Sequence, residues 1–133
     1  MDITLEQAQK LIETAIATAK SRGFRMSFAV VDSKRDLVAS ARMDGSRPFT
    51  PDVARGKAML TVLFEQPSSE LVERGGRQVF QMVNELYANK LAFAPGAVLV
   101  LQDGEVIGAV AASGATGEQD EEVAIAALAA LKA

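Results

Sequence analysis

The segment from Gly108 to Glu122 constrains the fold of this chain more than any other feature of the sequence. It reads GAVAASGATGEQDEE, in which the end of an apolar run is followed by a small-residue turn and an acidic helix start. Glycine adopts left-handed or crowded backbone conformations at little cost, so the turn predicts a tight strand-to-helix connection whose backbone faces a ligand. The candidate ligand-binding residues here are Ser113, Gly114, Thr116, Gly117 and Glu118.

Helices are predicted in several other places by the spacing of apolar residues and by capping signals. A first helix begins after Thr4, which caps it with Gln7 as its reciprocal partner, and ends near Gly23. Thr50, followed by proline, is typical of a helix cap, and that helix is expected to run to about Phe64. Three further helices are expected. A short helix spans residues 67–76, a longer one spans 77–90, and the last runs from about 117 to the end.

Two pairs of apolar runs predict antiparallel hairpins. Residues 26–31 and 36–43 are joined by four polar residues, and residues 97–101 and 106–112 are joined by Asp103 and Gly104. The alternation of helices with hairpins favours an α+β fold, with an antiparallel four- to five-stranded sheet and helices packed on it. A length of 133 residues suits a single domain spanning 1–133.

Composition removes several classes of function. The net charge is −3, which gives no electrostatic footprint for nucleic acid. The chain has no Cys and no His, so disulfides, thiolate chemistry, His-based triads and Cys/His zinc sites are excluded. General acid or base catalysis would therefore fall to Asp, Glu, Lys or the single Tyr87.

The N-terminus has no basic region followed by an apolar one, and no run of about 18 apolar residues occurs. We therefore expect a cytoplasmic protein with no membrane partner.

Three charged residues are the candidate catalytic groups. Asp44 follows a predicted strand end, where it could act as a general base or simply hydrogen-bond its own turn. Lys57 borders the apolar stripe of its helix, where it could reach a ligand carboxylate or extend over the sheet edge. Asp120, in the acidic helix start, is the third candidate.

The acidic helix start also limits what the glycine turn can bind. Carboxylates such as Glu118 and Glu121 already complement the positive end of the helix dipole and would repel a phosphate, so a phosphate-binding loop is not expected. Carboxylates three residues apart, as in Glu70 and Glu73, can chelate a hard cation, but surface helices produce this spacing by chance. We assign no metal-binding residue.

Several motifs in order carry a resemblance to a known family. The motifs are VVD at residues 30–32, RMDG at 42–45, ARGKA at 54–58, PS at 67–68, DGEVIGA at 103–109 and SGATGEQDE at 113–121. In their order and spacing the chain resembles the haem-degrading-domain family, also called GlcG/HbpS-like, which is related to the C-terminal domain of PduO-type cobalamin adenosyltransferases. The resemblance covers nearly the whole chain.

The resemblance implies an antiparallel α+β domain that forms homo-oligomers, from dimers up to octamers, and binds haem or a related tetrapyrrole. The chain departs from the family where Pro95-Gly96-Ala97 replaces a Gly-Gly-x-Pro element. Some haem-binding relatives use a His ligand, which this chain does not contain. The iron of a bound haem could instead be met by Met43, Tyr87, Lys57 or the Thr116 hydroxyl.

Our leading hypothesis is therefore a small-molecule binding protein that is accessory to a catabolic pathway. Haem is the candidate cofactor. Its pocket is expected between the RMDG loop and the SGATG turn, with Met43, Gly45 and Arg55 among the ligand-binding residues. The alternative is a small catabolic enzyme, a hydratase, isomerase or lyase, with Asp44 or Asp120 as acid or base and Lys57 or Arg55 orienting an anionic substrate. A third hypothesis is an accessory subunit that binds no ligand.

Overall fold

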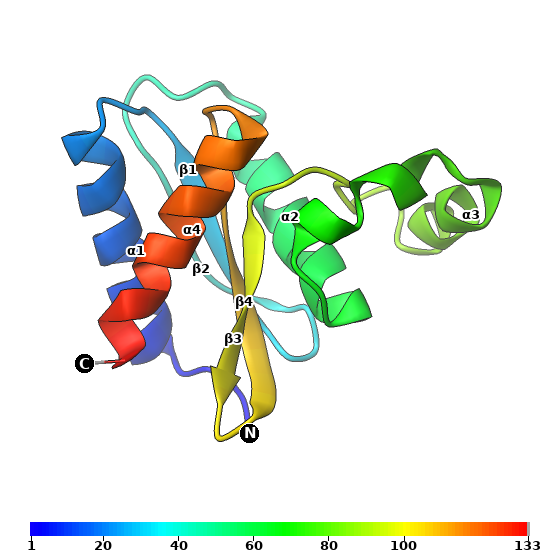
Figure 1. Ribbon diagram of the computed structural model, residues 1–133, viewed down its shortest axis with the longest axis horizontal. Coiled ribbons are helices and arrows are strands. Elements are labelled where there is room, and N and C mark those ends of the chain that lie inside the picture. The colour runs from blue at the N-terminus through cyan, green and yellow to red at the C-terminus, as the bar shows by residue number, and fades with distance from the viewer. Residues whose placement is uncertain (133) are drawn as a thin grey trace.

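The computed structural model describes residues 1–132. Its elements, in chain order, are α1 (Leu5–Ser21), β1 (Ser27–Asp32), β2 (Leu37–Arg42), α2 (Thr50–Phe64), the short 3-10 helices η1 (Ser68–Glu70) and η2 (Val72–Gly76), α3 (Gln78–Leu86), β3 (Ala97–Gln102), β4 (Glu105–Ser113) and α4 (Gly117–Lys132). The four strands form one sheet in the order β2-β1-β4-β3, with every neighbouring pair antiparallel (Figure 1).

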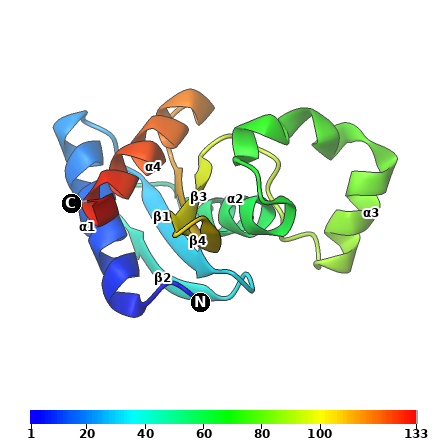
Figure 2. The same cartoon turned by 60° about the horizontal axis from the view of Figure 1, so that its bottom comes forward.

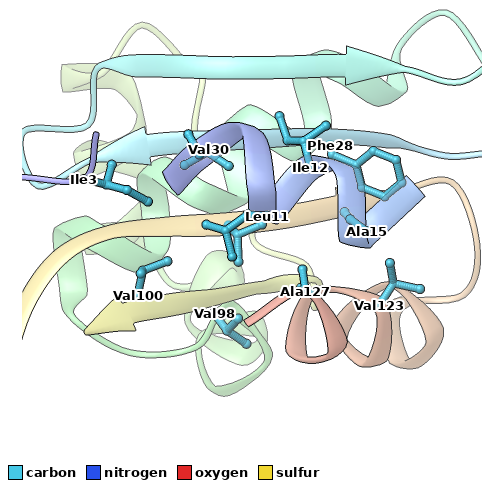
Figure 3. Packing of buried hydrophobic residues seen from close by; sticks show 14 of the residues in the cluster. Ile3, Leu11, Ile12, Ala15, Phe28, Val30, Val98, Val100, Val123 and Ala127 are labelled. Carbon is cyan, nitrogen blue, oxygen red and sulfur yellow. The ribbon is translucent and has the colours of Figure 1, made fainter. Parts of the chain in front are cut away.

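The sheet is covered on both faces. Helices α1 and α4 lie against one face and α2 lies against the other (Figures 1 and 2). On the α1/α4 face, large side chains such as Phe28 and Val30 of β1 pack against Leu11, Val123 and neighbouring residues (Figure 3). Burial of these apolar groups is the main term that stabilises the fold.

The α2 face is built from small residues. Ala29, Ala109 and Ala111 of the sheet meet Ala54 and Ala58 of the helix. Small side chains let a helix approach a sheet closely, and this approach is what buries Lys57 of α2 beneath the end of β4.

A third hydrophobic cluster packs beneath the segment between α2 and β3, residues 65–96, which we call the excursion. Its buried members are Leu60, Leu71 and Leu91, and the Phe80 ring of α3 lies 5.5 Å from that of Phe64. Figures 1 and 2 show the excursion projecting from the sheet, with α3 at its far end. None of the nine residues of α3 is buried.

Most of the predicted elements are confirmed. The fold is α+β with a four-stranded antiparallel sheet, and Thr4 and Gln7 form the expected capping box. The prediction that Thr50 caps α2 was wrong, because the helix begins at Thr50 itself and the Thr50 hydroxyl instead donates to the Arg47 carbonyl at 2.7 Å. The helix expected over 77–90 is shorter, because Ala88 and Asn89 both adopt left-handed backbone conformations.

Candidate functional site

The loop that follows β2 is fixed by hydrogen bonds among buried hydroxyl groups. The Ser27 hydroxyl lies 2.8 Å from that of Thr50 and 3.3 Å from that of Ser46. Ser46 in turn donates to the Met43 carbonyl, and the Arg42 guanidinium donates to the Ser46 carbonyl at 3.1 Å. These bonds fix the RMDG loop, residues 42–45, against the end of β1.

The turn that follows β4 is fixed by the start of α4. The Thr116 hydroxyl accepts from the Gln119 amide, and the Gln119 side chain accepts from the Thr116 amide, both at 3.2 Å. This is a capping box, which satisfies free donors at a helix start. The Ala115 amide donates to the Asp120 carboxylate at 2.9 Å, so the turn is also tied to a side chain beneath it.

Arg25 connects the loop and the turn. A Cβ added at Gly45, where φ is +83°, would lie 2.8 Å from Arg25 Nη1. A Cβ added at Gly114, where φ is +136°, would lie 2.7 Å from the Arg25 carbonyl oxygen. Both positions therefore favour glycine for their backbone conformation, and Gly114 also requires it for its close contact with the Arg25 backbone.

A hollow of about 510 Å³ opens between the loop and the turn. We call it the Thr116 hollow, and it is lined by Gly23, Phe24, Arg25, Gly45, Ser46, Arg47, Gly114, Ala115, Thr116 and Gln119. Residues distant in the sequence thus surround one space, as the position of the two glycine-containing bends suggested.

A second hollow, of about 530 Å³, adjoins the first. We call it the Met43 hollow, and it is lined by Ile16, Lys20, Gly23, Phe24, Arg25, Ala41, Arg42, Met43 and Asp44. Both hollows share Gly23, Phe24 and Arg25 as a common wall.

The charges of the two hollows are unbalanced. Their cationic side chains are Lys20, Arg25, Arg42 and Arg47, and the single carboxylate is Asp44. Within residues 1–132, none of these cations forms an ion pair. Their positive charge contrasts with the net charge of −3 on the whole chain.

Lys57 and Asp120 form a buried ion pair behind the turn. The two charged atoms are 2.9 Å apart, and the side chains are 3% and 4% exposed. Lys57 Nζ also donates to the Ala112 carbonyl at 3.1 Å. Gly96 leaves room for this ammonium, because a Cβ there would lie 2.7 Å from it. Burial raises the pKa of Asp120, an effect that the neighbouring Lys57 opposes.

The predicted site residues fall into several groups. Met43 and Asp44 line the Met43 hollow, and Gly45, Gly114 and Thr116 line the Thr116 hollow. Arg55 lines a separate hollow of about 480 Å³, together with Asp52, Val53, Gly56, Met59, Asn89, Lys90, Leu91 and Ala92.

The remaining predicted residues line none of these three hollows. Ser113 is buried at the end of β4, and Gly117 packs toward the Pro95 ring. Glu118 is exposed on the first turn of α4, and Lys57 and Asp120 are enclosed in their ion pair. Lys57 thus neither reaches the surface nor extends over a sheet edge.

Sequence reasoning missed the wall and most of the cations of the two hollows. Phe24 and Arg25 lie in the connection between α1 and β1, and Arg47 lies just after the RMDG loop. The sequence does show that Arg42 and Arg47 flank the glycine of the RMDG loop, which could have indicated a cationic site there. It also shows Arg25 shortly after a predicted helix end. Nothing local to Arg25, however, indicates that it contacts both glycines.

Within residues 1–132, no group of three or more acidic side chains is arranged to hold a metal ion. In the same range, each helix is too short or too polar to cross a membrane.

The chain is similar in sequence and in fold to several known proteins. The model of the haem-degrading HbpS-like family matches residues 3–129. A crystal structure of a double mutant of HbpS from Streptomyces reticuli is 31% identical, covers 98% of this chain and 88% of its own, and has a TM-score of 0.86. GlcG from Escherichia coli K12 is 33% identical over 113 residues, which are 84% of this chain and 81% of GlcG. The chain therefore belongs to the haem-degrading HbpS-like family.

A more distant solved structure shares the fold. The complex of PduOC with haem is 23% identical, covers 98% of this chain and 95% of its own, and has a TM-score of 0.86.

Proposed function

We propose that this protein binds haem or a related tetrapyrrole in the joined Met43 and Thr116 hollows. The observation that carries the proposal is the shared wall of Gly23, Phe24 and Arg25, which joins two hollows lined by both apolar side chains and cations. Membership of the haem-degrading HbpS-like family and the haem complex of PduOC support it.

The two hollows suit the chemistry of such a ligand. A tetrapyrrole is a large apolar ring with carboxylate groups at its edge. Ile16, Phe24 and Met43 offer apolar surface to the ring, and Arg25 and Arg47 offer planar guanidinium groups to the carboxylates. Each hollow, at about 530 and 510 Å³, falls within the volume range of ordinary ligand pockets.

Titration with haemin tests the proposal. We expect a saturable shift of the haemin Soret band on addition of the protein. The Arg25→Ala variant should bind about tenfold more weakly, because one charge-assisted hydrogen bond is lost. The matched control is Lys10→Ala, which removes an exposed cation of α1 that lines neither hollow. Absence of a saturable shift, or equal weakening by both variants, would contradict the proposal.

The protein also forms a homo-oligomer in this proposal. Val79, Met82 and Leu86 follow helical spacing on α3 and are 58%, 57% and 81% exposed. Such a helix gains little from burial in one chain, which favours packing against a second copy. Leu86→Glu should lower the mass measured by native mass spectrometry, whereas Ile125→Glu, on the exposed side of α4, serves as the control. An unchanged mass for Leu86→Glu would contradict this part.

The accessory role in a catabolic pathway stays a prediction of the family resemblance. The cytoplasmic location stays a prediction from the N-terminal sequence and from the absence of a long apolar run.

A further inference from the structure

Of the four side chains that the sequence offered as ligands of a haem iron, two lie away from the joined hollows. Lys57 is enclosed, with its ammonium bonded to Asp120 and to the Ala112 carbonyl. Tyr87 lies at the C-terminal end of α3 on the excursion, where the Arg35 guanidinium is 5.2 Å from the centre of its ring. Neither residue lines the Met43 or the Thr116 hollow.

The other two candidates are weak donors. The Thr116 hydroxyl already accepts the Gln119 amide as the cap of α4. The Met43 thioether is a neutral, soft ligand, and Met43 is half-buried in the floor of its hollow. Tight haem sites usually hold the iron with imidazole, thiolate or phenolate, and the chain contains no His and no Cys. The residues present therefore fit the ring and its carboxylates better than they fit the iron.

In contrast to the weak iron ligands, the groups that could bind the carboxylates of a tetrapyrrole are numerous. Lys20, Arg25, Arg42 and Arg47 face the joined hollows against the single carboxylate of Asp44. Arg25 is exposed, and the end of its side chain lies against Gly45 at the edge of the hollow. Charge-assisted bonds from guanidinium to carboxylate are among the stronger hydrogen bonds in proteins.

We propose that the site recognises a carboxylate-bearing tetrapyrrole by its apolar ring and its carboxylates, and not by its central metal. This inference rests on the proposed function and narrows it. The ligand class is an anionic tetrapyrrole with or without iron.

The experiment compares haemin with metal-free protoporphyrin IX, which has the same ring and carboxylates. Binding is measured on the intact protein, by absorbance for haemin and by porphyrin fluorescence for protoporphyrin. We expect the two dissociation constants to agree within about threefold. A difference of this size in binding free energy is smaller than the contribution of one typical hydrogen bond. Arg25→Ala should weaken both compounds by the same factor, about tenfold.

Two variants test for a bond to iron. Met43→Leu keeps the apolar contact and removes only the sulfur, so it should change both affinities by the same factor. Thr116→Asn keeps a good helix cap and removes the hydroxyl, with the same expectation. A loss of haemin affinity alone in either variant, with a change in the haemin spectrum, would reveal a metal ligand and overturn the inference.

The possible results separate the two proposals. Haemin binding that is tenfold or more tighter than protoporphyrin binding would overturn metal-independent recognition while leaving haem binding intact. Failure of both compounds to bind would overturn the proposed function and this inference together. Equal binding of both compounds, weakened equally by Arg25→Ala, would support both.

Discussion

Two groups of charges adjoin the turn Gly114–Thr116, and they differ in whether each charge has an opposite partner. Behind the turn, Lys57 and Asp120 are buried and paired with each other. In front of it, the cations of the joined hollows are open to solvent and outnumber their single carboxylate. Buried charges must be compensated within the protein, whereas charges at the surface are stable in water and remain able to bind a ligand.

The comparison suggests a division of roles around one turn. Asp120 holds Lys57 with one carboxylate oxygen and the Ala115 amide with the other, so the pair links α2 to the turn. The exposed cations contribute little to folding, because solvent screens them. Variants of the pair should therefore change stability, and variants of the hollows should change ligand affinity.

The largest effect is expected for Lys57→Met. It leaves the Asp120 carboxylate buried without its cation, which should cost about 3–5 kcal/mol of unfolding free energy at neutral pH. Chemical denaturation of the variant and of Lys57→Met/Asp120→Asn checks this. The double variant carries no buried charge and should recover most of the loss. A double variant as unstable as the single one would show that the ion pair is not the cause.

The loss in Lys57→Met should also depend on pH in a defined direction. Burial raises the pKa of Asp120, and without Lys57 nothing opposes that effect through charge. A carboxyl with a raised pKa in the folded state contributes stability below its ordinary value of 3.8 and loses it as the pH rises through the folded pKa. The destabilisation should therefore be small near pH 4 and grow toward neutral pH. A loss that is constant over this range would contradict the assignment.

Gly96→Ala should have the next largest effect. Gly96 has a φ of +139°, and a new Cβ would lie 2.6 Å from the Ala112 carbonyl oxygen and 2.7 Å from Lys57 Nζ. Strained backbone alone costs about 1–3 kcal/mol, and the displaced ammonium adds to it. Denaturation should show this loss, whereas Gly104→Ala, also at positive φ but with open space around it, should cost less. Equal losses would mean that the contacts with the Ala112 carbonyl and with Lys57 are both unimportant.

The sequence was sufficient for features that depend on neighbouring residues. The capping box of Thr4 and Gln7 and the Asp103–Gly104 hairpin are local, and both were predicted. The prediction for Thr50 failed because its hydroxyl has a competing partner in the Arg47 carbonyl and contacts Ser27, which is distant in the sequence. Capping propensity could not reveal that partner.

The candidate site was predictable only in part for the same reason. The glycines at 45 and 114 pointed to two bends, but only the folded chain shows that both pack against Arg25. Lys57 and Asp120 are 63 positions apart, so their charges gave no sign of being paired. Both were interpreted as candidate catalytic groups open to a ligand, because isolated charges in a sequence are usually solvated.

A smaller effect, on affinity alone, is expected for Arg25→Ala/Arg47→Ala. Removing both guanidinium groups should weaken haemin binding by about a hundredfold, from about 1.4 kcal/mol for each lost charged contact. The free energy of unfolding should change by no more than about 0.5 kcal/mol for each exposed side chain. Titration and denaturation of the same preparation measure both quantities. A large loss of stability would place Arg25 with the structural charges and not with the ligand-binding ones.

The smallest expected effect comes from salt, and it acts on only one of the two groups of charges. At about 0.1 M ionic strength the screening length is near 10 Å, and at about 1 M it is near 3 Å. Haemin binding through the exposed cations should weaken by a few-fold over this range, whereas the Lys57–Asp120 pair is shielded from the solvent ions. The destabilisation caused by Lys57→Met should therefore stay nearly constant over the same salt series. If haemin affinity proves insensitive to salt while this destabilisation falls, the assignment of the two groups of charges is reversed.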